Sequence, residues 1–595
     1  MRSLREYKKS TILTPILVIG EVVFEALIPY VIALLVNDVK AGYGISHTLH
    51  YGGILLIMAF CSLFFGYGAG VTCAESSCGL SKNLRHDVFY RIQEFSFHNI
   101  DTFSRASLVT RLTTDVQNVQ QAWMMLIRTA FRAPLNILLS FFMAWYMGGS
   151  IAVIFAAVIP FLGLGLFLVI RFTMPLFRKG FPKYDLLNNS VEENVRGIRV
   201  VKSYVREDYE KEKFSKASGS IQKIFTKAER ILAFNNPLMQ ACVYAVMLFV
   251  LSFGSREIIV TGGKALDIGQ FSSLLTYSFQ ILASLMMLSM IFVMVTFAAE
   301  SSTRIAEVLQ TDSDLVSPED GLRQVEDGSV DFQNVSFKYE KDAEQPVLSD
   351  INLHIRSGEV IGVIGGTGSA KSSLVQLIPR LYDTSEGTVC VGGKDVRSYD
   401  LITLRDNVAM VLQKNVLFSG TIADNIRWGN PNATDEEVRE VCRLACADEF
   451  IDRMPDGYNT WIEQGGTNVS GGQKQRLCIA RALLKKPKIL ILDDSTSAVD
   501  TRTDAEIRNA MRTYLPDTTK IIIAQRTSSV EDADRIIVMD KGRINAIGTS
   551  RELIRSNRIY REVYLSQNKQ GTDSIPDVTD YPDKETERKE APDEQ

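Results

Sequence analysis

The chain has 595 residues, 46% of them hydrophobic, and carries a formal net charge of −4. This length is too great for one hydrophobic core and predicts several domains. The nearly balanced charge gives no indication of a nucleic-acid partner. The 8 cysteines form no CxxC pair typical of a metal site, and those of the second half are interpreted as reduced cytosolic thiols.

Six apolar stretches in the first half of the chain are long enough to cross a bilayer, which needs about 20 residues. They lie near 13–36, 50–74, 124–147, 151–172, 232–259 and 270–298. The short basic segment 1–12 precedes them and is interpreted as an amphipathic lead-in at the membrane surface. The first stretch is too long for the apolar core of a signal peptide. We therefore predict a membrane domain of six transmembrane helices over 13–300, surrounded by lipid.

The connections between these stretches alternate in character. Those after the second and fourth stretches are long and polar, and 173–230 is rich in Lys and Arg. The positive-inside rule places these segments, the N-terminus and the second half of the chain in the cytoplasm. A separate cytoplasmic domain would also account for them. The apolar helical periodicity continues from the spans into these segments, however, and favours helices that extend out of the membrane.

Several polar side chains fall inside the predicted spans, where an unpaired charge is costly. They are Glu21, Glu25, Arg128, Arg132, Asn136, Gln240 and Gln280. Glu21 and Glu25 are four residues apart and share one helix face. Two interpretations stay open: these groups line a water-filled cavity, or the carboxylates pair with Arg128 or Arg132 between helices.

The second half of the chain reads as a separate domain. Residues 301–327 are polar and are interpreted as a linker. From Val330 on, strand and helix patterns alternate, which predicts an α/β domain over 328–565. Residues 566–595 are charged, contain prolines and lack apolar periodicity, so we expect a disordered tail. The predicted fold is an α-helical membrane domain followed by an α/β P-loop nucleotide-binding domain.

A glycine-rich segment between an apolar strand and a helix predicts a phosphate-binding loop, although such a turn can also occur without a ligand. Its residues are Gly365, Gly366, Thr367, Gly368, Ser369, Ala370, Lys371, Ser372 and Ser373. In this interpretation Lys371 reaches the β- and γ-phosphates of ATP and Ser372 binds Mg²⁺. Ala370 stands where the pattern G-x-x-x-x-G-K-[ST] has its second glycine. Because a methyl group is small, nucleotide binding is still expected.

Two further segments point to the same chemistry. An apolar strand ends at Asp493, and a strand-end carboxylate beside a P-loop is a Mg²⁺ ligand. Further upstream, Ser470 and Gln473 have the spacing of a capping box at the start of a helix. That helix is either simply well capped, or it also presents its N-terminus to a phosphate.

Together, these motifs resemble the ATP-binding-cassette transporter family, in the exporter type that fuses membrane and nucleotide-binding domains. The resemblance covers nearly all of 1–565. The family signature is matched by Val469, Ser470, Gly471, Gly472 and Gln473, and the D-loop by Ser497, Ala498, Val499 and Asp500. The coupling segments of the family are matched by residues 100–103, 111–116 and 197–202.

The resemblance implies a role for each matching residue. Tyr339 would stack on adenine, and Gln413 would sense Mg²⁺ beside Ser372 and Asp493. The signature residues would bind the γ-phosphate of an ATP held by a second subunit, so two domains would enclose two ATP molecules.

Three positions depart from the family pattern, all in one half-site: Ala370, Asp494 for the catalytic glutamate, and Gln525 for a histidine. Aspartate is shorter by one methylene, and an error of about 1 Å can cost on the order of 100-fold in rate. We therefore expect this site to bind ATP but hydrolyse it poorly.

A homodimer would contain two such impaired sites. We predict a heterodimer with a related but distinct half-transporter, in a bacterial plasma membrane, that exports amphipathic small molecules in the manner of multidrug efflux. The alternatives are a non-hydrolytic regulatory subunit, a lipid or peptide exporter, and an importer built on the exporter fold.

Overall fold

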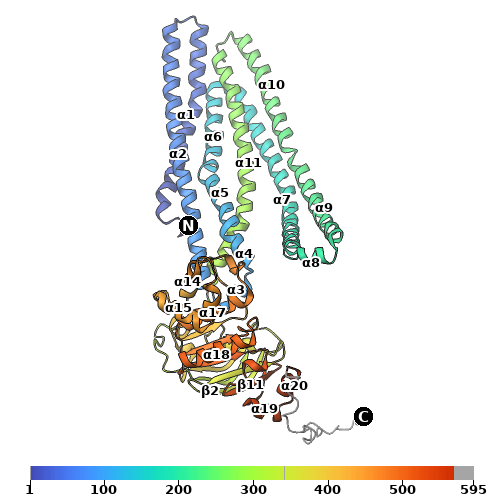
Figure 1. Cartoon of the computed structure of the whole chain (residues 1–595). Coiled ribbons are helices and arrows are strands. Elements are labelled where there is room, and N and C mark those ends of the chain that lie inside the picture. The colour runs from blue at the N-terminus through green and yellow to red at the C-terminus, as the bar shows by residue number, and fades with distance from the viewer. Residues whose placement is uncertain (1, 341, 568–595) are drawn as a thin grey trace, which may run out of the picture. The chain divides into compact units, whose positions relative to one another are not determined.

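The computed structural model describes residues 2–340 and 342–567 (Figure 1). It divides into two compact units. The helical unit comprises Met1–Glu94 and Phe103–Asp312, and the sheet unit comprises Phe95–Thr102 and Ser313–Gln595. The predicted disordered tail lies outside the described residues from 568 onward.

The helical unit is built almost entirely from long helices. Its elements are η1 (Arg2–Tyr7), α1 (Lys8–Lys40), α2 (Ile45–Glu94), α4 (Arg105–Thr110), η2 (Arg111–Asp115), α5 (Val116–Ile127), α6 (Thr129–Gly148), η3 (Gly149–Ala152), α7 (Val153–Arg196), α8 (Ile198–Ser203), α9 (Glu207–Leu232), α10 (Asn235–Thr261) and α11 (Ile268–Gln310). The 50 residues of α2 span about 75 Å, far more than the roughly 30 Å hydrocarbon core of a bilayer. One continuous helix therefore includes both an apolar span and the polar segment that follows it.

Among the described residues, five helical runs are long and apolar enough to cross a membrane. They are Ser3–Lys40, Ile45–Glu94, Arg105–Gly180, Glu207–Thr261 and Ile268–Phe292. The third run contains both α6 and α7, which meet at the 3₁₀ turn η3, where Gly149 has a φ of +51°. Because this run holds two of the predicted spans, the five runs are consistent with six crossings.

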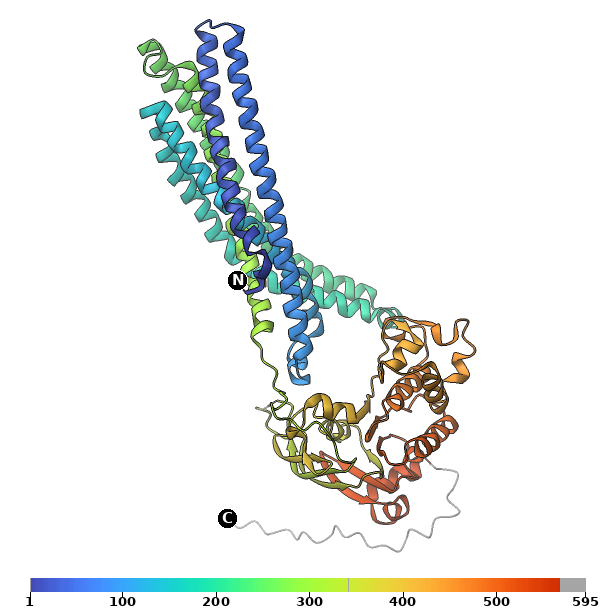
Figure 2. The same cartoon turned by 90° about the vertical axis from the view of Figure 1, so that its left-hand side faces the viewer.

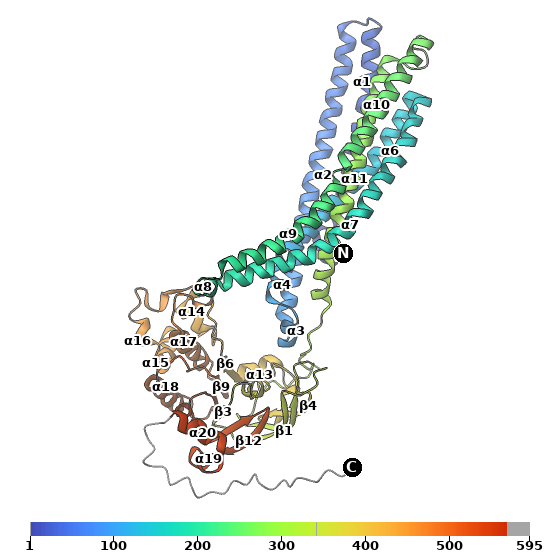
Figure 3. The same cartoon turned by 90° about the vertical axis from the view of Figure 1, so that its right-hand side faces the viewer.

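Neighbouring helices of this unit pack along their length. In Figure 2, α1 and α2 lie side by side, and Val18, Val22 and Ala69 form a buried cluster. In Figure 3, α7 and α9 also lie side by side, and the chain reverses between them through α8, after Gly197. Tight helix packing therefore extends into the polar ends of these helices.

A buried carboxylate in η2 forms hydrogen bonds to α11, the last helix of this unit. Asp115, which is fully buried, accepts hydrogen bonds from Arg304 and Ser301 of α11. Arg111, in the same π-helical segment η2, donates to Glu307 at 2.7 Å. These contacts satisfy groups whose burial would otherwise be costly.

The sheet unit contains two main sheets. Its strands are β1 (Val330–Phe337), β2 (Leu348–Ile355), β3 (Val360–Gly365), β4 (Glu386–Val391), β5 (Lys394–Asp395), β6 (Val408–Val411), β7 (Gly420–Thr421), β8 (Trp461–Ile462), β9 (Ile489–Asp493), β10 (Thr519–Ile523), β11 (Arg535–Asp540) and β12 (Arg543–Gly548). The larger sheet has the order β12-β11-β3-β10-β9-β6 and is parallel except at β12. The smaller, antiparallel sheet has the order β2-β1-β4-β5. The central strands are buried apolar runs, as expected for a parallel sheet covered on both faces.

Helices complete the sheet unit. They are α3 (Phe97–Thr102), α12 (Lys371–Gln376), η4 (Val396–Ser398), α13 (Leu401–Asn407), α14 (Ile422–Arg427), α15 (Asp435–Leu444), α16 (Asp448–Ile451), η5 (Gly457–Asn459), η6 (Gln464–Gly466), α17 (Gly471–Leu484), α18 (Thr501–Tyr514), η7 (Thr527–Ser529), α19 (Ser550–Ser556) and α20 (Arg558–Gln567). The parallel strands β3, β10, β9 and β6 are neighbours, so their carboxyl ends lie along one edge. In open α/β sheets, ligands bind at this edge.

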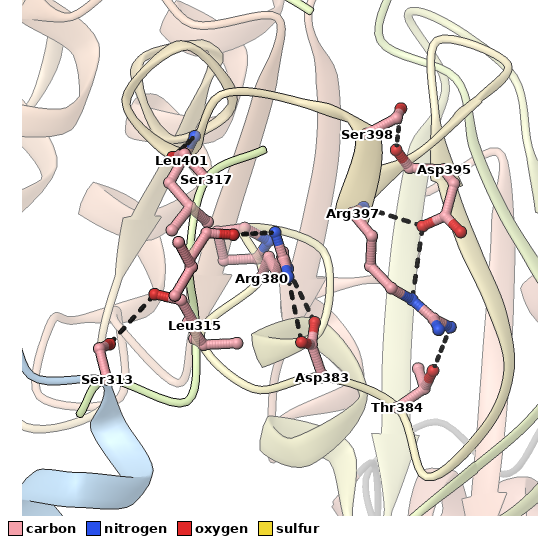
Figure 4. Close-up of polar contacts among 12 residues, drawn as sticks. Ser313, Leu315, Ser317, Arg380, Asp383, Thr384, Asp395, Arg397, Ser398 and Leu401 are labelled. Atoms are coloured by element: carbon pink, nitrogen blue, oxygen red, sulfur yellow. Dashed lines mark hydrogen bonds and ion pairs between the residues drawn. The ribbon is translucent and has the colours of Figure 1, made fainter. Parts of the chain in front are cut away.

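The segment after α11 is attached to the sheet unit by polar contacts (Figure 4). Arg380, which is held by Asp383, donates to the carbonyl oxygen of Val316 at 3.4 Å. The backbone N–H of Leu401, at the start of α13, donates to Ser317 Oγ at 3.0 Å. The range 301–327 predicted as a linker thus begins inside α11, and its part from Ser313 onward belongs to the sheet unit.

Candidate functional site

The predicted P-loop connects β3 to α12, at the carboxyl edge of the parallel sheet. Gly365 ends β3, and a Cβ atom there would lie 2.3 Å from the carbonyl oxygen of Met539 on β11. Gly368 has a φ of +81°, in the left-handed region that favours glycine. The loop therefore has the strand–turn–helix context in which backbone N–H groups converge on a phosphate.

Ala370 occupies a strained backbone position. Its φ is +68° and its ψ is 25°, so a residue with a Cβ atom adopts the left-handed conformation just before α12. That conformation costs an L-residue about 1–2 kcal/mol, whereas glycine adopts it without steric conflict. The structure thus gives a physical reason for the glycine of the sequence pattern and for the cost of its replacement.

Lys371 lies folded over the P-loop. Its Nζ donates to the carbonyl oxygens of Gly365 and Gly366 at 2.8 and 2.9 Å. Burial lowers the pKa of Lys371, while the nearby carboxylates of Asp493 and Asp494 oppose that shift. The ammonium group is thus held at the loop, where an anionic phosphate would contact it.

Ser372 and Asp493 converge, as expected for two ligands of one cation. The Ser372 side chain hydrogen-bonds to Asp493, which is only 3% exposed at the end of β9. Burial raises the pKa of Asp493, and neighbouring Asp494 raises it further. A hydroxyl and a carboxylate are the oxygen ligands that Mg²⁺ prefers, so these residues fit the ion.

Asp494 and Gln525, two of the three positions that depart from the family pattern, contact each other. Gln525 Nε2, just beyond β10, donates to Asp494 Oδ2 at 2.8 Å. Gln413, just beyond β6, also hydrogen-bonds to Asp494. Burial raises the pKa of Asp494, and these two amide contacts oppose the shift. The structure therefore brings Asp494, Gln525 and Gln413 together at the carboxyl edge of the parallel sheet.

Tyr339, the predicted adenine contact, lies next to the P-loop helix. Its hydroxyl oxygen is 2.9 Å from Ser373 Oγ, and it donates to Gln376 Oε1 at 3.2 Å. The side chain remains partly exposed, with 38% of the residue accessible. An aromatic ring at this place is available for stacking against a nucleobase.

The signature segment forms the predicted capping box. Ser470 is the N-cap of α17, its Oγ accepts from the Gln473 N–H at 3.3 Å, and Gln473 Oε1 accepts from the Ser470 N–H. A Cβ atom at Gly472 would lie 2.8 Å from the carbonyl oxygen of Ala498. Glycine here thus permits a close approach between the signature and the D-loop.

The sequence reasoning missed the residues that hold the D-loop. Gln475, which is buried in α17, accepts from the Ala498 N–H at 2.9 Å and donates to Ser497 Oγ at 3.2 Å. Arg526 donates to the carbonyl oxygens of Ser497 and Val499. Asp500 caps α18 through the Thr503 N–H, and this bond lowers the pKa of Asp500. The one sequence signal was position: Gln475 lies two residues after the signature and Arg526 follows Gln525.

The first coupling segment carries a further contact that sequence did not reveal. Asp101, in α3, accepts a hydrogen bond from the Tyr382 hydroxyl at 2.7 Å. Phe97 of the same helix packs edge-on against the Tyr382 ring, at 6.0 Å between centroids. Tyr382 in turn meets the Tyr339 ring at 5.1 Å. One aromatic residue therefore touches both α3 and the predicted adenine contact.

Comparisons with known proteins agree with this geometry. The family model described as ABC transporter transmembrane region matches 11–285, and the one described as ABC transporter matches 348–497. An uncharacterized ABC transporter ATP-binding protein of Bacillus subtilis, YfiB, is 34% identical over 94% of this chain and 96% of its own. An ATP-dependent lipid A-core flippase of Desulfotalea psychrophila is 30% identical over 86% of this chain and 89% of its own. A bacterial Atm1-family ABC exporter solved with ATP bound has a TM-score of 0.82, at 24% identity over 96% of this chain and 99% of its own.

Proposed function

Because the chain belongs to the ABC transporter family, with membrane and nucleotide-binding domains fused, we propose that it is one half of a heterodimeric ATP-driven exporter. As a member of this family it is an ATP-hydrolysing transporter. The proposal adds that its own ATP site hydrolyses slowly, and that its intact signature completes a faster site on a distinct partner chain.

The contact between Asp494 and Gln525 carries this proposal. In the family, a glutamate and a histidine act on the attacking water and the γ-phosphate from these two positions. Here the shorter carboxylate accepts a hydrogen bond from an amide, which supplies neither an imidazole nor a positive charge. The strained Ala370 adds a third change in the same half-site.

The signature, in contrast, keeps all the features that a γ-phosphate site needs. Ser470, Gly471 and Gly472 open a capped helix, and Gln475 fixes the neighbouring D-loop. Chance drift would not confine its changes to the ATP-binding half and spare the signature half. This division of intact and altered motifs favours a partner whose own P-loop, catalytic glutamate and histidine are intact.

Each part of the site has a role toward Mg²⁺-ATP. Ser372, Asp493 and Gln413 would hold the ion, which neutralises charge on the phosphates when bound. Lys371 and the loop N–H groups bind the phosphates, and Tyr339 stacks on the adenine. ATP binding draws the nucleotide-binding domains together, and the coupling segments pass this closure to the helices of the membrane domain.

We assign the transported molecules to amphipathic small compounds, moved out of a bacterial cell through the plasma membrane. One relative is by name a lipid flippase, so a substrate with apolar and polar parts agrees with the family. In this proposal the N-terminus and the nucleotide-binding domain face the cytoplasm, where ATP is available. Lipid or peptide export remains the alternative within this class.

The decisive experiment compares ATP hydrolysis by the purified chain alone with hydrolysis by the chain co-purified with its natural partner. We expect the pair to be active and the single chain nearly inert. Replacing the partner's catalytic glutamate with glutamine should then abolish turnover. If the chain alone hydrolyses ATP at the rate of the pair, the asymmetric heterodimer is wrong.

A non-hydrolytic regulatory subunit is the competing function from another class. The contacts of Asp101 with Tyr382 favour transport, because they attach a coupling segment to the nucleotide-binding domain. Uptake by inside-out vesicles, with ATP and with a non-hydrolysable analogue, separates the two. Uptake only with ATP supports the exporter, no uptake supports the regulator, and ATP-driven loss from preloaded vesicles indicates an importer.

A further inference from the structure

A cavity of about 370 Å³ lies among α1, α6 and α11, within the predicted membrane spans. This volume falls in the range of small-molecule sites. Its apolar wall is formed by Ile28, Pro29, Ile32, Ala133, Ala283 and Met287, and its polar groups come from Glu25, Arg132, Asn136, Thr276, Gln280 and Ser284. A mixed lining of this kind suits a ligand with both apolar and polar parts.

Two carboxylates share one guanidinium beside this cavity. Arg132 Nη2 donates to Glu25, and Arg132 Nη1 lies 3.3 Å from Glu21 Oε1. The Glu25 and Arg132 side chains remain 27% and 28% exposed, whereas the Glu21 side chain is 9% exposed. At formal charges, Glu21 and Glu25 are negative and Arg132 is positive, so this group of three has one unpaired negative charge.

The second oxygen of Glu21 lacks a donor. Within the described part of the chain, Glu21 Oε2 is buried without a hydrogen-bond partner. A methyl group at Gly66 would lie 3.0 Å from Glu21 Oε1, so the missing Cβ of Gly66 makes room for this carboxylate beside α2. A buried acceptor without a donor is costly. A second hydrogen bond from Arg132 to Glu21 would therefore be favourable.

Arg128 lies outside the lining of this cavity. Its Nη1 lies near Gly70, one helical turn along α2 from Gly66, or about 6 Å. Of the two carboxylates, Glu25 is the one that lines the cavity, together with Arg132.

We propose that this cavity binds the positively charged head of an amphipathic cation, with Glu25 as its counter-ion. This inference rests on the proposed export function and names its substrate class. When the cation binds Glu25, Arg132 turns to Glu21 and forms the bidentate pair that Arg and carboxylate favour. Every charge then has a partner. An anion would instead attract Arg132 and leave two carboxylates unpaired in the membrane, which is strongly unfavourable.

The network on α11 supports a preformed site. Asn136 Nδ2 donates to Ser284 Oγ at 3.1 Å, and Ser140 Oγ donates to Gln280 Oε1 at 3.0 Å. These bonds fix the polar side chains of α6 and α11 on one side of the cavity. The cation would meet a wall whose positions are already set, so binding needs little rearrangement beyond Arg132.

The test uses two probes of nearly equal size and opposite charge, tetraphenylphosphonium and tetraphenylborate. Each is titrated without nucleotide into the full assembly, purified with its partner in lipid nanodiscs, and binding to empty nanodiscs is subtracted. We expect protein-bound tetraphenylphosphonium and no specific tetraphenylborate signal. Glu25→Gln should weaken tetraphenylphosphonium binding about tenfold or more, as expected for loss of one desolvated charge partner.

Glu75→Gln is the matched control, because it also removes one negative charge. Glu75 lies on α2 outside the cavity lining and accepts a hydrogen bond from Ser10. It should bind tetraphenylphosphonium like the unaltered protein. The same cation should raise the melting temperature of the unaltered protein and of Glu75→Gln, but not that of Glu25→Gln. Equal binding by both variants, or tetraphenylborate binding that depends on Glu25, would overturn the proposal. Because no ATP is present, failure here is distinct from failure of the ATPase asymmetry.

Discussion

The methyl group of Ala370 is expected to cost stability because the backbone there is left-handed. Ala370→Gly should stabilise the assembly by about 1 kcal/mol, since glycine relieves the left-handed strain. Thermal unfolding of the purified assembly measures this gain. Ala505→Gly is the matched control in the interior of α18, where the same exchange should destabilise by about 1 kcal/mol. A loss of stability at both positions would contradict the strain argument.

The pair Asp494 and Gln525 makes a second prediction at the level of single residues. With the partner's catalytic glutamate replaced by glutamine, the double variant Asp494→Glu/Gln525→His should regain ATP hydrolysis. We expect a rise on the order of 100-fold, the cost of an error of about 1 Å in placing a catalytic group. Steady-state phosphate release measures it.

The control keeps the imidazole and removes the carboxylate. Asp494→Asn/Gln525→His should stay as inactive as the unaltered site, because the water then lacks a carboxylate. If both double variants remain inactive, the slow site has another cause than these two side chains.

Much of this site was predictable residue by residue. Asp493 ends a strand, and Asp494, Gln413 and Gln525 follow strands. Because parallel strands end at one edge of a sheet, all four residues are expected at that edge. The replacement of glycine by Ala370 was visible in the pattern. Its strain was not, because φ depends on how β3 and α12 meet.

At the level of elements, the contact of α3 with Tyr382 predicts a coupling defect. Tyr382→Phe keeps the ring packing against Phe97 but removes the hydrogen bond to Asp101. Substrate transport should fall severalfold more than ATP hydrolysis, since a hydrogen bond to a charged group contributes about 1.5–3 kcal/mol. Parallel assays of uptake and phosphate release in proteoliposomes measure this split.

Tyr564→Phe serves as the control for this change, because the Tyr564 hydroxyl lies on α20 and makes a long, 3.5 Å contact with Glu531. Transport and hydrolysis should stay unchanged in that variant. If Tyr382→Phe lowers transport and hydrolysis by the same factor, the contact affects the ATP site rather than the coupling.

Elements with local signals were predictable, and elements set by distant contacts were not. The capping box of Ser470 and Gln473 lies within four residues, and its prediction is confirmed. In contrast, Tyr382 is 281 residues from Asp101, and nothing in either segment identifies the other. The π-helical turn η2 is likewise fixed by Asp115 and its partners on α11, far along the chain.

At the level of the whole molecule, the family and both domain types were predictable because each has a strong pattern: long apolar runs in one half, ordered phosphate motifs in the other. The partner chain was inferred from what this chain lacks. In the proposed function, another chain supplies the groups that the altered ATP site lacks, so the functional unit would include both chains.

The proposed asymmetry of the two ATP sites predicts how long each ATP is retained. The site with Ala370, Asp494 and Gln525 should keep its ATP through several turnovers and hold the two nucleotide-binding domains in contact, while the partner's site exchanges in each cycle. After radiolabelled ATP is loaded and chased with unlabelled ATP during turnover, about half of the bound label should persist, as expected for one slow site of two. Asp494→Glu/Gln525→His should abolish the persistent fraction, because both sites then turn over. Release of all label in a single fast phase from the unaltered assembly would show that the two sites cycle alike, and retention would then have no part in the transport cycle.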